Sequence, residues 1–114
     1  MTTSDDARRY LPLTPAAFQV LVALADDELH GYALLKAVER QTGGEIRLST
    51  GTMYGLLTRL LADDVVGEKT TRDGRRLYRL TPFGRAVARA EADRLEALLR
   101  TARATRALRR PSTS

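Results

Sequence analysis

Cations gather around a tight turn in the stretch KTTRDGRRLYRLT, which runs from residue 69 to residue 81. The dipeptide Asp73-Gly74 between alternating segments predicts a β-hairpin with a two-residue type I′ turn, which needs positive φ at both central residues. This turn would place Lys69 opposite Tyr78. Four cations surround it: Lys69, Arg72, Arg75 and Arg76. A hairpin does not require them, and like charges repel, so we expect the tip to contact an anionic partner through phosphate groups.

A second chemical pattern lies in the segment LSTGTMYGLLTRLL, residues 48–61. Ser49 suits the N-cap of a helix, and an apolar stripe at helical spacing follows it: Met53, Leu56, Leu57, Leu60 and Leu61. The opposite face carries small or hydrogen-bonding residues, namely Thr52, Gly55, Thr58 and Arg59. Gly55 lowers helix stability by about 1 kcal/mol relative to alanine. Such a face suits close approach by another surface.

Two further helical patterns precede this segment. Thr14-Pro15 predicts the start of a first helix, whose apolar residues recur at helical spacing until the acidic turn at residues 26–28. A second helix is expected from about residue 31 to residue 42, and Gly43-Gly44 ends it because glycine tolerates the left-handed conformation found there.

A long helix is predicted after the hairpin. Thr81-Pro82 marks its start, and its pattern runs to roughly Leu108. At about 1.5 Å per residue it would be about 40 Å long, which is longer than the three preceding helices can cover. An apolar stripe without a partner in its own chain indicates a second chain, so we expect a homodimer. The expected interface residues are Val87, Leu95, Leu98, Leu99 and Ala102.

These elements together predict a fold that is mainly α with a small β-hairpin: a winged helix-turn-helix with a long C-terminal dimerisation helix. Residues 1–12 are expected to form a flexible N-terminal segment, 13–81 the DNA-binding domain, 82–109 the dimerisation helix and 110–114 a disordered tail. In this fold the second helix braces the third, whose small polar face enters the DNA major groove. The hairpin tip then reaches the flanking backbone or minor groove, which makes double-stranded DNA the expected partner.

Composition argues against several other classes. The chain has 114 residues, no cysteine and one histidine, which predicts a single domain without disulfides, a thiolate site or a histidine metal cluster. We expect no metal and no cofactor. No segment resembles an export signal or a membrane span, so we expect a cytoplasmic protein with no membrane partner. No catalytic triad, phosphate loop or pair of acids in an apolar setting is evident, which argues against an enzyme. The net charge of +5 permits an anionic partner.

Three motifs also carry a resemblance to a known family. They are the pattern LxxLxxxxLHGYxLLKxxExxTGG at residues 21–44, LSTGTMYGLLTRL at residues 48–60 and RRLYRLTPFGR at residues 75–85. In this order, and over about residues 13–89, they resemble the PadR family of bacterial transcriptional regulators. The single C-terminal helix is similar to that of the shorter subfamily. The resemblance implies a homodimeric repressor that binds an inverted-repeat operator, often autoregulatory and often controlling an efflux or detoxification gene.

The resemblance also extends the set of expected DNA contacts. It adds the hydroxyl-rich start of the third helix and a tyrosine at the start of the second. The full set is Tyr32, Ser49, Thr50, Gly51, Thr52, Tyr54, Gly55, Thr58, Arg59, Lys69, Arg72, Gly74, Arg75 and Arg76. Gly55 departs from the family, which commonly has proline there. Some relatives bind flat aromatic drugs between their C-terminal helices through tryptophan. This chain has no tryptophan, so the resemblance does not extend to that pocket. Another small-molecule effector could still release the protein from its operator.

The sequence is also compatible with other interpretations. The same fold could serve as a protein-interaction module without sequence-specific DNA binding, in which the hairpin and third helix dock an acidic protein. A MarR-like regulator is a further alternative, although that fold usually adds an N-terminal dimerisation helix and residues 1–10 are short and polar. Tyr78 is expected to pack in the core, and His30 is expected to be a turn histidine with a local hydrogen bond.

Overall fold

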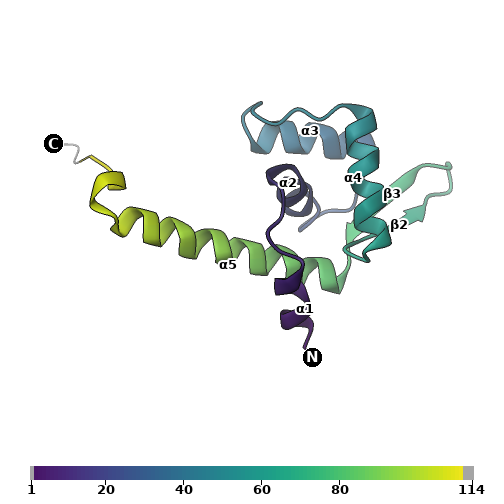
Figure 1. The fold of residues 1–114 in the computed structure, drawn as a ribbon. Coiled ribbons are helices and arrows are strands. Elements are labelled where there is room, and N and C mark those ends of the chain that lie inside the picture. Colours follow the sequence, from purple (N-terminus) through teal and green to yellow (C-terminus); the bar gives the residue numbers. More distant parts are fainter. Residues whose placement is uncertain (1, 112–114) are drawn as a thin grey trace.

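The computed structural model describes residues 2–111. Residues 112–114, which belong to the tail expected to be disordered, lie outside the described residues. Helices and a small sheet alternate along the chain (Figure 1). They are α1 (Thr3–Arg9), α2 (Pro15–Ala23), β1 (Leu29–His30), α3 (Gly31–Gln41), α4 (Thr50–Ala62), β2 (Val66–Thr70), β3 (Arg76–Leu80), α5 (Pro82–Ala104) and the 3-10 helix η1 (Arg106–Leu108). Figure 1 shows the hairpin of β2 and β3 at one end of the molecule and α5 running toward the other.

Three helices begin at the hydroxyl caps that the sequence predicts. Thr14, Ser49 and Thr81 precede α2, α4 and α5, and each side-chain oxygen accepts a hydrogen bond from a backbone N–H three residues on, at 2.9–3.1 Å. Pro15 and Pro82 follow two of these caps in the first helical position, where no N–H is needed. The local sequence therefore sets where these helices start.

The hairpin differs from its predicted register by one residue. Tyr78 lies opposite Glu68, not Lys69. Only Gly74 of the central pair has a positive φ, at 82°, and its N–H donates to the Thr71 carbonyl at 2.9 Å. The turn is therefore a three-residue loop with a left-handed glycine rather than a two-residue type I′ turn. A one-residue slip moves each side chain to the other face of the sheet, and in the observed register Tyr78 is buried.

The sheet has three strands rather than two. The short strand β1 pairs with β3, which gives the order β1-β3-β2. Its two residues are too few for a periodic signal, so the sequence does not predict it. His30 accounts for part of this pairing, because its Nδ1 lies 2.8 Å from the Arg76 carbonyl oxygen. The expected local hydrogen bond of His30 is therefore wrong, since its partner is 46 residues away.

The core lies where α2, α3, α4 and the sheet meet the first half of α5. Its fully buried side chains include Val20, Leu21, Leu34, Val38, Met53, Leu57, Leu60, Val65, Tyr78 and Val87. Gly84 allows α5 to cross closely, since a Cβ there would lie 1.9 Å from the Val65 carbonyl oxygen. Burial of Val87 corrects its assignment to the dimer interface, because a side chain with 0% exposure in its own chain cannot contact another.

Both ends of the chain differ from expectation. A helix, α1, occupies most of the segment predicted to be flexible; a capping box formed by Thr2 and Asp5 starts it, and Ala7 is buried where it packs on α5. Helix α5 ends at Ala104, and the separate turn η1 follows, so the last helix does not continue to Leu108. Within residues 2–111 no helix is long and apolar enough to cross a membrane.

Helices α3 and α4 are joined by a short loop, and the β2–β3 hairpin follows directly. The long helix α5 then packs across the base of this unit. This order and packing make the chain a winged helix-turn-helix, as the sequence predicts.

Candidate nucleic-acid interface

Helix α4 presents the small polar face predicted for it. Ser49, Thr50, Gly51, Thr52, Tyr54, Gly55, Thr58 and Arg59 are all exposed. Met53, Leu57 and Leu60 on the other side are buried, so one face of α4 anchors it in the core. The exposed face is therefore held rigidly by the domain behind it.

The two glycines of α4 leave the helix backbone open to approach. A Cβ at Gly51 or Gly55 would meet no atom within 4 Å, so neither glycine is needed for packing within the chain. Gly55 weakens the helix without any compensating contact here. A binding surface that must come close to the backbone would account for it.

The threonine hydroxyls on this face differ in what they offer. The Thr58 hydroxyl donates to the Tyr54 carbonyl at 2.8 Å, so its proton is used within the helix. The Thr52 oxygen instead accepts from the Ser49 hydroxyl at 2.9 Å. Thr52 therefore keeps a proton to donate outward, whereas Thr58 presents mainly a methyl group and lone pairs.

Two tyrosines extend this face onto the start of α3. The Tyr54 hydroxyl lies against Gly31, where a Cβ would be only 2.8 Å away, so glycine at the start of α3 makes room for it. Tyr32 is 68% exposed, and the Lys36 ammonium lies 5.5 Å from its ring centroid. Lys36 is a cation outside the set of expected DNA contacts, although its position four residues after Tyr32 places both on one helical face. The exposed surface thus spans the beginnings of α3 and α4.

The hairpin tip supplies the cations. Among the residues that the structure describes, Arg72 and Arg75 form no ion pair, whereas the Lys69 ammonium lies 3.1 Å from Glu28 and Arg76 lies 3.9 Å from Glu68. Pairs as exposed as these contribute little to stability, so a polyanion can replace the carboxylates at small cost. A hydrogen bond from the Thr71 hydroxyl lowers the pKa of Asp73, which keeps the tip's one carboxylate ionised and the loop ordered.

The second half of α5 exposes the leucines predicted to meet a partner. Leu95, Leu98 and Leu99 are 39%, 53% and 56% exposed, and Ala102 is half-buried. Figure 1 shows this part of the helix extending beyond the remainder of the domain. Within residues 2–111 these side chains are only partly covered, and they form a contiguous apolar stripe at helical spacing.

Residues 20–90 match the model of the transcriptional regulator PadR-like family, which is more than half of the chain. The chain belongs to the PadR-like family. It is 42% identical over 84 residues to the transcriptional regulator Rv3488 of Mycobacterium tuberculosis, covering 71% of this chain and 76% of that protein. It is 43% identical over 77 residues, 68% of the chain, to an uncharacterised 37.1 kDa protein in transposon TN4556 of Streptomyces fradiae, of which it spans 22%.

The fold of this chain is also found in solved structures. A transcriptional regulator from Clostridium thermocellum superposes with a TM-score of 0.68 at 20% identity, over 89% of this chain and 94% of that one. Membership of this family identifies the chain as a transcriptional regulator and not an enzyme. No group of three or more metal-ligating side chains occurs in the part of the chain that the structure describes.

Proposed function

We propose that this PadR-like protein is a cytoplasmic, homodimeric repressor that binds an inverted-repeat operator in double-stranded DNA. Helix α4 enters the major groove, and the hairpin tip contacts the flanking backbone or minor groove. The observation that carries this proposal is the open face of α4, where no atom lies within 4 Å of a Cβ position at Gly51 or Gly55. A helix with this face exposed can approach base edges more closely than one covered by long side chains.

The division of labour on this surface follows from the chemistry of its side chains. Thr52 has a hydroxyl proton and a methyl group that can meet a base edge or a thymine methyl, so it contributes to sequence choice. Arg72 and Arg75, which are exposed and form no ion pair within residues 2–111, contribute affinity and position through phosphates. Arg59, toward the end of α4, is suited to a phosphate contact at the rim.

A homodimer supplies a second α4 helix, which can bind the second half-site of the operator. The exposed stripe of Leu95, Leu98 and Leu99 supports pairing of two α5 helices, because an apolar surface of this kind on a free helix favours association. A two-fold dimer presents two α4 helices to half-sites about one DNA turn apart, or a multiple of it, on one face of the duplex. Repression follows when such a dimer occupies a promoter.

The proposal is tested with DNA selected from a random pool by the wild-type protein. Thr52→Ala should weaken binding to the selected sequence by about 1–3 kcal/mol and leave binding to random DNA of equal length nearly unchanged. Thr101→Ala, on an exposed position of α5, is the matched control and should change neither affinity. Fluorescence anisotropy at fixed salt measures both affinities.

Two outcomes would contradict the proposal. A selection that enriches no sequence would favour the alternative that the same surface docks an acidic protein. Binding that survives insertion of about five base pairs between the selected half-sites would exclude a rigid dimer reading one face of the duplex, since that insertion rotates one half-site by roughly half a turn.

A further inference from the structure

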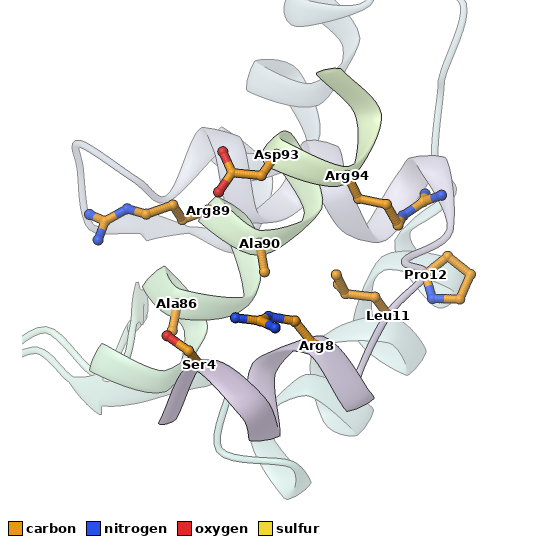
Figure 2. Close-up of a pocket in the computed structure, with 9 residues that line it drawn as sticks. All are labelled: Ser4, Arg8, Leu11, Pro12, Ala86, Arg89, Ala90, Asp93 and Arg94. Atoms are coloured by element: carbon orange, nitrogen blue, oxygen red, sulfur yellow. The ribbon is translucent and has the colours of Figure 1, made fainter. Parts of the chain in front are cut away.

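A pocket of about 590 Å³ lies between α1, the segment after it and the first half of α5. Its apolar surface comes from Leu11, Pro12, Ala86 and Ala90. The volume is in the range of pockets that hold small-molecule ligands. Figure 2 shows residues of α1 and α5 facing each other across this pocket, and none of the residues that line it belongs to α4 or to the hairpin. The pocket is therefore separate from the proposed DNA-binding surface.

The charged side chains around the pocket are mostly positive. Arg8, Arg89 and Arg94 line it together with one acid, Asp93. Arg94 is already paired with the buried Glu91, whereas Arg8 and Arg89 form no ion pair with any residue in the described range 2–111. In Figure 2 the Arg8 guanidinium reaches from α1 across the middle of the pocket, with Arg89 and Asp93 on one side and Arg94 beside Pro12 on the other. This charge balance favours a ligand with one negative charge.

The apolar part of the pocket restricts the ligand further. No aromatic side chain lines it, so a flat ring has no face on which to stack. Alanine, leucine and proline side chains instead form a smooth aliphatic surface. We propose that the pocket binds a small amphipathic anion with one carboxylate on an aliphatic chain. Arg8 and Arg89 bind the carboxylate, and the chain lies along Leu11 and Ala90.

The α1 wall of the pocket is connected to α4. Tyr10, at the end of α1, donates its hydroxyl to Asp63 at the end of α4, at 2.6 Å. Its ring packs edge-on against Phe83 of α5, with 6.2 Å between centroids. Burial, followed by the bond to Asp63, raises the pKa of Tyr10 to about 12.

The α5 wall is connected to α2. Glu91 of α5 is buried and accepts a hydrogen bond from the Leu13 N–H at 2.8 Å, just before α2 begins. A ligand that moves α1 relative to α5 therefore displaces Tyr10 while Glu91 holds the remainder of the domain. The position of α4 then depends on whether the pocket is occupied. This consequence rests on the proposed function, whereas ligand binding itself does not.

Direct binding is measured first, by calorimetry with three probes of one chain length: decanoate, decanol and decyltrimethylammonium. Decanoate should bind, and the neutral and cationic probes should bind at least tenfold more weakly or not at all. Arg8→Ala should weaken decanoate binding about tenfold, because it removes a charge-assisted hydrogen bond. Arg9→Ala is the matched control, since Arg9 is paired with Asp6 and does not line the pocket, and it should leave the affinity unchanged.

Absence of decanoate binding, or equal binding of all three probes, would overturn the proposed site. If the wild type does not bind decanoate, sedimentation of Arg8→Glu shows what the pocket does instead. A changed sedimentation coefficient would then mean that the pocket is a contact between two copies of the chain. These measurements need no DNA, so they test the site whether or not the proposed function holds.

Coupling to DNA is measured second, with the selected operator. Decanoate should lower the operator affinity of the wild type, and Tyr10→Phe should bind decanoate normally but lose this effect. Phenylalanine keeps the ring that packs on Phe83 and removes only the hydroxyl that binds Asp63. An equal effect of decanoate on both proteins would show that the signal does not pass through Tyr10, and no effect on either would overturn the coupling.

Discussion

Gly55 separates a binding role from a structural one, because the two roles predict opposite changes in stability. Its site is in the interior of α4, exposed, and without any atom within 4 Å of a Cβ position. Gly55→Ala should therefore raise the free energy of unfolding by about 1 kcal/mol, the difference in helix propensity. For a domain of this size that corresponds to a rise in melting temperature of roughly 4 °C. Gly55→Leu should give nearly the same rise, since leucine is almost as good a helix former.

Binding should change in the other direction. The alanine methyl group projects from the face that we propose enters the major groove, and the leucine side chain projects further. Gly55→Ala should weaken operator binding, and Gly55→Leu should abolish it by steric block. Thermal unfolding followed by circular dichroism at 222 nm, at one fixed protein concentration, gives the first quantity. Fluorescence anisotropy with the selected duplex gives the second.

Gly84→Ala is a useful contrast for this experiment. A Cβ at Gly84 would lie 1.9 Å from the Val65 carbonyl oxygen, so this substitution should lower the melting temperature and confirm that the assay detects a glycine needed for packing. The reasoning about Gly55 is refuted if Gly55→Leu binds the operator with wild-type affinity, because α4 is then not in the groove. It is also refuted if Gly55→Ala lowers the melting temperature, because the glycine is then needed by the fold.

Three further predictions concern other surfaces. The double variant Leu95→Glu, Leu98→Glu should sediment as a monomer, whereas Ala97→Glu, on the opposite side of α5, should sediment as a dimer. If the double variant remains a dimer, α5 is not the dimer interface. Arg75→Ala should weaken binding to operator and random DNA equally and reduce the slope of log affinity against log salt by about one unit, and an unchanged slope would mean that no phosphate is contacted. The hydrogen bond from Arg94 lowers the pKa of Glu91 from its ordinary value of 4.5. The ionised Glu91 therefore stabilises the fold above pH 4.5, and this stabilisation is lost as the pH falls through the lowered pKa. Glu91→Gln should therefore reduce the free energy of unfolding by about 1–3 kcal/mol at pH 7 and by progressively less as the pH falls through the lowered pKa, as urea titrations at a series of pH values would measure. A loss that does not change with pH would contradict this assignment.

Much of the candidate interface could be predicted because it rests on local features. A hydroxyl cap acts on a backbone N–H three residues away, so Ser49 marks the start of α4 without knowledge of anything else in the fold. The buried side of α4 follows from helical spacing, which fixes the opposite, exposed side as well. The surface formed by α4 and the hairpin cations was therefore evident from the sequence.

The hairpin register could not be predicted in the same way. Asp73-Gly74 is compatible with more than one turn, and the choice depends on which side of β3 packs on the core. Burial of Tyr78 favours the register with the three-residue loop, because the alternative would turn that ring toward solvent. Val87 was misassigned for a related reason: its spacing matches the stripe of α5, but only packing shows that this stripe is covered in the first half of the helix and open in the second.

By itself, the sequence determined where the helices begin, which side of each is apolar, where the cations gather and which family the chain resembles. Those properties depend on interactions within a few residues. The tertiary structure alone decided the third strand, the packing of α1 on α5 and the pocket between them. Tyr10 meets Asp63 across 53 residues and Leu13 meets Glu91 across 78, and such contacts are chosen by the packing of the whole chain, since no local period or cap specifies a partner at that distance.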